Sequence, residues 1–192
     1  MRTVRQIELL EAAVSIVAEE GFSRLTIRKV AAAVGVTEPA VYRHFSSKLD
    51  LLIAIIEDLQ EAIAPLFRRI AEGAETPEDL FGGFVAGLFS VLNENPAFAP
   101  LVFSEEAFHA EPELRPLLFR MMSSNLDILA GALAKMQGNG VIRSDADASE
   151  LALMTMGSIR LTITRVHLSD GSIKLADQTG RLADLLANLC RK

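Results

Sequence analysis

The 192-residue sequence contains a single cysteine, Cys190, which lies near its end. One thiol cannot form an intramolecular disulfide, and this usage is typical of proteins from a reducing compartment. No apolar run reaches the ~18 residues of a membrane-spanning helix, and the N-terminal stretch lacks the apolar core of a signal peptide. We therefore expect a cytoplasmic protein with no disulfide framework and no membrane segment.

Sequence signatures of catalysis and of metal binding are also missing. His44, His109, His167 and Cys190 do not have the spacing of metal ligands. Neither a nucleophile elbow nor a phosphate-binding loop occurs. We therefore expect no enzyme activity, no metal site and no cofactor.

Strand signals are almost absent, because alternating Val/Ile/Thr stretches with hairpin turns do not occur. Apolar residues instead recur at three- and four-residue steps, which predicts helices. Glycines mark helix ends, and prolines mark helix starts. The pattern predicts an all-α fold of about nine helices. After a first helix that ends at Gly21, we expect helices over residues 27–34, 38–44, 48–71, 77–93, 98–107, 112–137, 147–168 and 174–190.

Two of the predicted helices, 27–34 and 38–44, are short and are joined at Gly35, which is the spacing of a helix-turn-helix. Val36 and Val41 can close a small core between them. Residues 1–48 carry a net charge of +2 and the remainder carries −8, which weakly favours a polyanionic partner at the N-terminal end. The alternative is a pair of ordinary amphipathic helices with no role in DNA binding.

The exposed side of the second short helix carries candidates for reading bases. Arg43 could bind a guanine edge through both arms of its guanidinium group. Glu38 could accept a hydrogen bond from a cytosine amino group, and Pro39 and Ala40 could contact thymine methyl groups. His44 lies on the same side, although it could equally be a surface histidine with no task.

Other residues of this segment are candidates for phosphate contacts. Thr37 stands at a helix N-terminus, where backbone amides and a hydroxyl can hold a phosphate. Tyr42 and Lys48 are suited to the same role, and Thr26 and Arg28 could contact the DNA backbone from the start of the preceding helix.

Residues 21–52, GFSRLTIRKVAAAVGVTEPAVYRHFSSKLDLL, resemble the DNA-binding domain of the TetR family of transcriptional regulators. The chain departs from the family's pattern at Glu38–Pro39, where a small or basic residue is common. This pair lies on the surface that would face the DNA groove, so the departure bears on which operator sequence is bound and not on the fold. The shared features are Gly21–Phe22, Thr26, Ile27, Val30–Ala31, Gly35–Val36, Tyr42, His44–Phe45, Lys48 and Leu52.

The resemblance implies a three-helix DNA-binding domain over residues 1–47 and a helical bundle for ligand binding and dimerisation over residues 48–192. It also implies a homodimer that represses transcription until a small ligand releases a palindromic operator. Helices 147–168 and 174–190 would form the dimer interface, with Leu182, Leu185, Leu186 and Leu189 on the last helix and small Thr155, Ser158 and Thr162 on the other. The alternative for these faces is packing within one monomer.

The second part of the chain is rich in adaptable apolar residues, because seven of the ten phenylalanines fall in residues 81–119. Such residues suit a pocket for an apolar or amphipathic ligand, and core packing is the alternative. Gly82, Gly83 and Gly87 each cost about 1 kcal/mol of helix stability relative to alanine, which indicates that a helix contact or a ligand uses the space. The candidate ligand-binding residues are Phe84, Phe89, Phe103, Phe108, Phe119, Met122, Met156 and Arg160.

Two other functions stay open at this point. The chain could be a family member without a small effector, whose second domain serves dimerisation or binds a protein. It could also be an all-α enzyme or adaptor that reuses the helical bundle.

Overall fold

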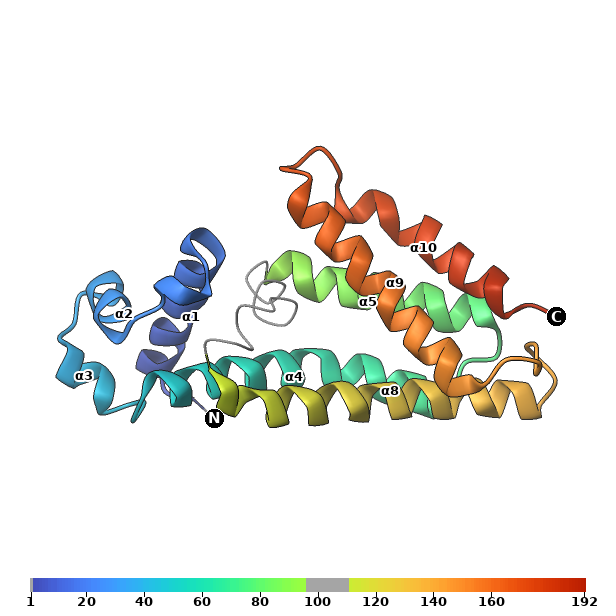
Figure 1. The fold of residues 1–192 in the computed structure, drawn as a ribbon, viewed down its shortest axis with the longest axis horizontal. Helices are drawn as coiled ribbons and strands as arrows, with labels where there is room; N and C mark the ends of the chain where they lie inside the picture. Colours follow the sequence, from blue (N-terminus) through green and yellow to red (C-terminus); the bar gives the residue numbers. More distant parts are fainter. Residues whose placement is uncertain (1, 96–110) are drawn as a thin grey trace. The chain divides into compact units, whose positions relative to one another are not determined.

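The computed structural model describes residues 2–95 and 111–192, and this part of the chain is built from helices without strands (Figure 1). The all-α prediction is thus confirmed. The helix predicted over 98–107, with Phe103 and Phe108, lies outside the described residues. The elements are α1 Val4–Glu20, the 3-10 helix η1 Phe22–Arg24, α2 Ile27–Val34, α3 Glu38–Tyr42, α4 Lys48–Glu72, α5 Pro77–Glu94, the 3-10 helix η2 Pro112–Leu114, α8 Arg115–Gly138, α9 Ala148–Leu168 and α10 Leu175–Cys190.

The chain forms two compact units. Among the described residues, the N-terminal unit holds residues 2–61, Asn95 and residues 111–119. The C-terminal unit holds residues 62–94 and 120–192. The domain boundary predicted at residues 47 and 48 stays a prediction.

In the N-terminal unit, α1 begins with a capping box. The Thr3 hydroxyl accepts a hydrogen bond from the Gln6 amide at 3.2 Å, and the Gln6 side chain accepts one from the Thr3 amide at 3.0 Å. These bonds satisfy amides that a helix start leaves without partners. The buried face of α1 is centred on Leu9 and Ala13, and Ile7 lies outside this face and is exposed to solvent.

Arg2, just before α1, forms hydrogen bonds to α4 within the same unit. Its Nε donates to Asp58 Oδ1 at 2.7 Å, and its Nη2 donates to the Ala54 carbonyl oxygen at 2.7 Å. A guanidinium group that joins a carboxylate and a helix carbonyl forms charge-assisted bonds, which are stronger than neutral ones.

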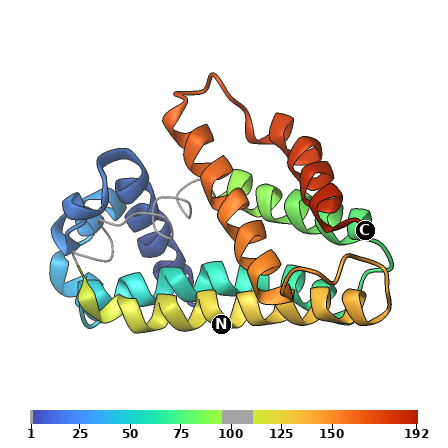
Figure 2. The ribbon, with the colours of Figure 1, turned by 45° about the vertical axis from the view of Figure 1, so that its right-hand side comes forward.

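In the C-terminal unit, α10 packs against α5 and α9, as two views of the molecule show (Figures 1 and 2). Phe81 and Val85 of α5 and Leu186 and Ala187 of α10 are buried in this core. Gly87 permits a close approach of α5 to α4, since a Cβ atom there would lie 2.3 Å from Leu66 Cδ2. Of the two uses of the space that the glycines indicate, a helix contact and a ligand, the structure shows the helix contact at Gly87.

One described segment, Pro112–Gly138, is long and apolar enough to cross a membrane by length and composition. A single helix of this kind is weak evidence for a membrane span, because helices of soluble proteins pass the same test.

Candidate DNA-binding site

The turn between α2 and α3 is built by local chemistry. At the start of α2 the Thr26 hydroxyl accepts a hydrogen bond from the Lys29 amide at 3.2 Å. At its end Gly35 adopts φ 72° and ψ 33°, the left-handed conformation that glycine enters most readily. The Val36 amide then donates to the Ala31 carbonyl oxygen at 2.9 Å, which reverses the chain toward α3.

We expect Gly35→Ala to lower the free energy of unfolding by about 1–2 kcal/mol, because a Cβ atom disfavours left-handed backbone. No atom lies within 4 Å of that Cβ position, so backbone strain is the whole cost. Gly35→Asn is the matched control and should cost less, since asparagine tolerates this conformation. Urea denaturation of both variants measures the difference, and equal costs would contradict the argument.

The recognition helix α3 is shorter than predicted. It ends at Tyr42 instead of residue 44, so Arg43 and His44 lie in the turn that follows it. The Phe45 amide donates to the Val41 carbonyl oxygen at 3.0 Å, and the chain here turns the Phe45 side chain into the core. Val41 is also fully buried, so α3 is held to the unit from one side and is free on the other.

Most of the residues that are predicted to contact DNA are exposed at the surface, where a duplex could reach them. Thr37 occupies the N-cap position of α3, but its hydroxyl accepts no capping hydrogen bond. This hydroxyl can therefore accept or donate elsewhere. Of the predicted set, Ala40, His44 and Lys48 are half-buried, and the exposed members are Thr26, Arg28, Thr37, Glu38, Pro39, Tyr42 and Arg43.

Lys48 begins α4, directly after the helix-turn-helix. The preceding serines fix this start, because the Ser46 amide donates to Asp50 Oδ2 at 2.9 Å and the Asp50 amide donates to Ser47 Oγ at 3.0 Å. The Lys48 ammonium forms an ion pair with Glu111, with Nζ and Oε1 3.0 Å apart. Sequence reasoning missed Glu111, since nothing in a single sequence relates two residues so far apart along the chain.

The predicted ligand-binding residues divide by their exposure. Phe84 and Phe89 are buried, and Phe84 packs edge-to-face on Phe67 with ring centroids 5.2 Å apart. Both therefore pack within the C-terminal unit. Phe119 and Met122 are exposed. Met156 and Arg160 are half-buried.

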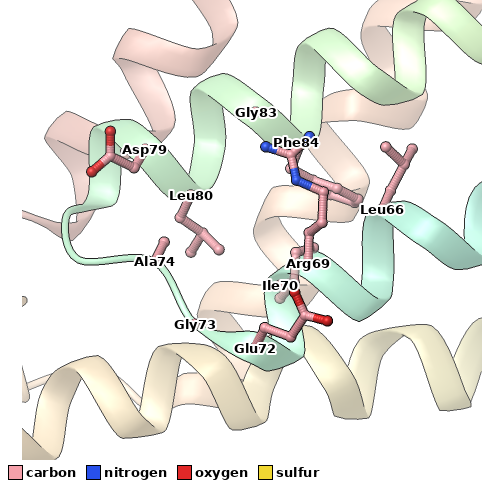
Figure 3. A pocket seen from close by; sticks show the side chains of 10 residues that line it. All are labelled: Leu66, Arg69, Ile70, Glu72, Gly73, Ala74, Asp79, Leu80, Gly83 and Phe84. Atoms are coloured by element: carbon pink, nitrogen blue, oxygen red, sulfur yellow. The ribbon is translucent and has the colours of Figure 1, made fainter.

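A pocket of about 240 Å³ opens between the end of α4 and the start of α5 in the C-terminal unit (Figure 3). Its walls are apolar at several positions and charged at others, so it can accommodate an amphipathic group. Phe84 is the one predicted ligand-binding residue among those that line it. The lining residues are Leu66, Arg69, Ile70, Glu72, Gly73, Ala74, Asp79, Leu80, Gly83 and Phe84.

The side chain of Arg69 lies beside α5 in this pocket (Figure 3). A Cβ atom on Gly83 would come 3.7 Å from Arg69 Nη2, so the glycine leaves room for the guanidinium group. The sequence offered one usable signal for this site. Leu66, Arg69 and Ile70 share one face of α4 by their spacing, as Leu80 and Phe84 share one face of α5.

The predicted dimer helices keep part of their apolar surface exposed. Leu182 and Leu186 are buried within the unit, and so is Thr155, whereas Leu185 and Leu189 are exposed on α10. Leu153, Met154, Leu161 and Leu168 are the exposed large apolar residues of α9.

A capped helix, a left-handed glycine and a short second helix with one exposed polar side form a helix-turn-helix, a unit that DNA-binding proteins place in the major groove. Residues 9–55 match the model of the family described as bacterial regulatory proteins, tetR family. Residues 9–55 thus carry the DNA-binding domain of this family of transcriptional regulators, and the family is not one of enzymes.

Relatives with established names span nearly the whole chain. The fatty acid metabolism regulator protein of Bacillus subtilis (strain 168) is 26% identical over 185 residues, covering 96% of this chain and 94% of that protein. The nucleoid occlusion factor SlmA of Photobacterium profundum is 24% identical over 190 residues, covering 97% and 95%. The transcriptional regulator FadR from Bacillus subtilis, solved in complex with stearoyl-CoA, has the same fold, with a TM-score of 0.81, 23% identity and coverage of 94% and 97%.

Proposed function

We propose that this DNA-binding regulator is a homodimeric repressor, which a small amphipathic ligand releases from a palindromic operator. One observation carries the proposal: α3 is fixed to the N-terminal unit through buried Val41, while Thr37 and Arg43 stand exposed around it. A polar helix surface held in this way can enter the major groove. Residues 1–47 would bind DNA, and residues 48–192 would bind the ligand and the second subunit.

Dimerisation through α9 and α10 is supported by their exposed apolar residues. Leu153, Leu161 and Leu168 on α9 and Leu185 and Leu189 on α10 cost free energy while they face water. A second copy of the chain would bury them, and two recognition helices would then contact half-sites about 34 Å apart or a multiple of that distance. The proposed site of action is the cytoplasm, where the DNA lies.

We propose a long-chain acyl thioester as the ligand. A relative that covers most of the chain is named for fatty acid metabolism. The pocket between α4 and α5 supports an amphipathic ligand, since Leu66, Ile70 and Leu80 supply apolar contacts and Arg69 a positive charge for an anionic group. A pocket of about 240 Å³ would hold only part of such a molecule.

A second candidate function is favoured by the match to nucleoid occlusion factors over 97% of the chain. In this alternative the chain binds DNA without a small effector, and residues 48–192 serve dimerisation or a protein partner. The two candidates differ in one measurable property, which is the response of DNA binding to a ligand.

We expect the full chain to bind a palindrome in its own upstream DNA more tightly than a scrambled duplex of equal length. The affinity should fall steeply with salt, because lysine and arginine contacts release counterions from phosphates. Fluorescence anisotropy at several salt concentrations measures both properties. Equal affinity for all duplexes would contradict the operator proposal.

The same assay separates the two candidates. Addition of stearoyl-CoA should weaken operator binding if the acyl thioester proposal is correct, and free coenzyme A is the matched control for the shared head group. Unchanged binding with both compounds would favour the second candidate.

A further inference from the structure

The ion pair between Lys48 and Glu111 joins two parts of the N-terminal unit that serve different purposes. Lys48 follows the helix-turn-helix and is a predicted phosphate contact. Glu111 lies directly before η2, which leads into α8. The side chains are 27% and 21% exposed, so the pair is shielded from most solvent screening.

Lys48 occupies a position that local electrostatics disfavour. It is the first residue of α4, where the partial positive charge of the helix N-terminus repels an ammonium group. A lysine here gains most from an anion in front of it. Glu111 supplies such an anion in this structure, at 3.0 Å.

Glu111 is held in place by its own element. The Leu114 amide donates to the Glu111 carbonyl oxygen at 3.0 Å, and Leu114 is buried. Arg115 continues the chain into α8 without a break. A shift of the start of α8 would therefore move the Glu111 carboxylate with it.

We propose that Glu111 competes with operator phosphate for Lys48 and so acts as an intramolecular brake on DNA binding. This inference rests on the phosphate contact assigned to Lys48 in the proposed function. One ammonium group cannot keep a 3.0 Å contact with the carboxylate and give its full charge to a phosphate. A phosphate contact of Lys48 therefore weakens the Lys48–Glu111 pair, and this loss subtracts from the affinity for DNA.

The brake gives the start of α8 a direct influence on the DNA-binding surface. A movement of η2 that brings Glu111 closer to Lys48 strengthens the competition, and a movement away from it weakens the competition. A ligand that shifts α8 would change DNA affinity through the Lys48–Glu111 contact. The change cannot exceed the difference between the ligand's binding free energies for the two arrangements of α8.

The test is duplex binding by Glu111→Gln in the full chain. Removal of the competing carboxylate should tighten binding about threefold to fivefold, which is the upper part of the range for one ion pair near the protein surface. Glu113→Gln is the matched control: Glu113 lies exposed in the same turn, forms no ion pair among the described residues, and carries the same charge. Its effect should stay below about twofold, since screened long-range repulsion is weak.

A double-variant cycle shows whether the effect acts through Lys48. Lys48→Met should weaken binding and lower the slope of affinity against salt by about one, and adding Glu111→Gln to it should change the affinity by less than about twofold. Circular dichroism verifies that each variant keeps its helix content. Equal effects of Glu111→Gln and Glu113→Gln would overturn the brake, as would a full gain in the Lys48→Met background.

The assay uses both the upstream palindrome and a scrambled duplex. Phosphates are present in both, so the brake should act on both alike. If the wild-type chain does not distinguish the two duplexes, the operator proposal fails, while the comparison of Glu111→Gln with Glu113→Gln still decides the brake.

Discussion

Phe81→Ala is expected to lower the free energy of unfolding by about 3–5 kcal/mol. Phe81 is 0% exposed and lies in the core between α5 and its neighbours. Truncation to alanine removes the transfer free energy of the ring, and it also leaves a cavity because α5 and α10 cannot collapse fully into the space. A chain of marginal stability would lose a large fraction of its total with this one change.

Phe119→Ala is the matched control, because it removes the same atoms from a residue that is 72% exposed on α8. Its free energy of unfolding should change by less than about 0.5 kcal/mol. Urea denaturation, followed by circular dichroism, measures both variants. A loss as large for Phe119 as for Phe81 would show that Phe119 is covered, for instance by a second subunit, and comparison at several protein concentrations would detect this.

Local chemistry explains why much of the fold could be predicted from the sequence. α2 spans residues 27–34 as predicted, because the Thr26 hydroxyl cap and the left-handed Gly35 act on residues next to them. The start of α5 at Pro77 follows equally local chemistry, since the Thr76 hydroxyl accepts from the Asp79 amide at 3.1 Å. α3 ended early because buried Phe45, a tertiary feature, decides where the chain turns.

Features that depend on distant segments could not be predicted in the same way. Helical periodicity shows that α1 has an apolar face. The packing of α2 against α1 decides which of these apolar residues are buried, and Ile7 is not among them. The phenylalanine cluster indicates apolar character, yet composition cannot separate buried Phe84 from exposed Phe119. The Lys48–Glu111 pair is visible only once the fold brings both residues together.

Arg43→Ala is expected to weaken operator binding by about 1–3 kcal/mol and to relax the preference for the base pair that Arg43 contacts. The structure places Arg43 at the C-cap of α3, exposed and directly after the helix. From this position a guanidinium group can reach the edge of a guanine and bind its O6 and N7 atoms together. Glu38 and Pro39 occupy the first turn of the same helix, so they would act on other positions of the half-site.

Arg43→Lys separates base recognition from charge. Lysine keeps the positive charge but lacks the planar pair of donors, so it should retain most of the salt dependence while the base preference falls. The measurement is the affinity of wild type, Arg43→Ala and Arg43→Lys for operators with each base pair of one half-site exchanged in turn. A bidentate contact predicts that one exchange costs the wild type about 1–3 kcal/mol and costs Arg43→Ala almost nothing. If every exchange costs the three proteins the same, Arg43 contacts phosphate and the bases are read by other residues, with Glu38 the first to test.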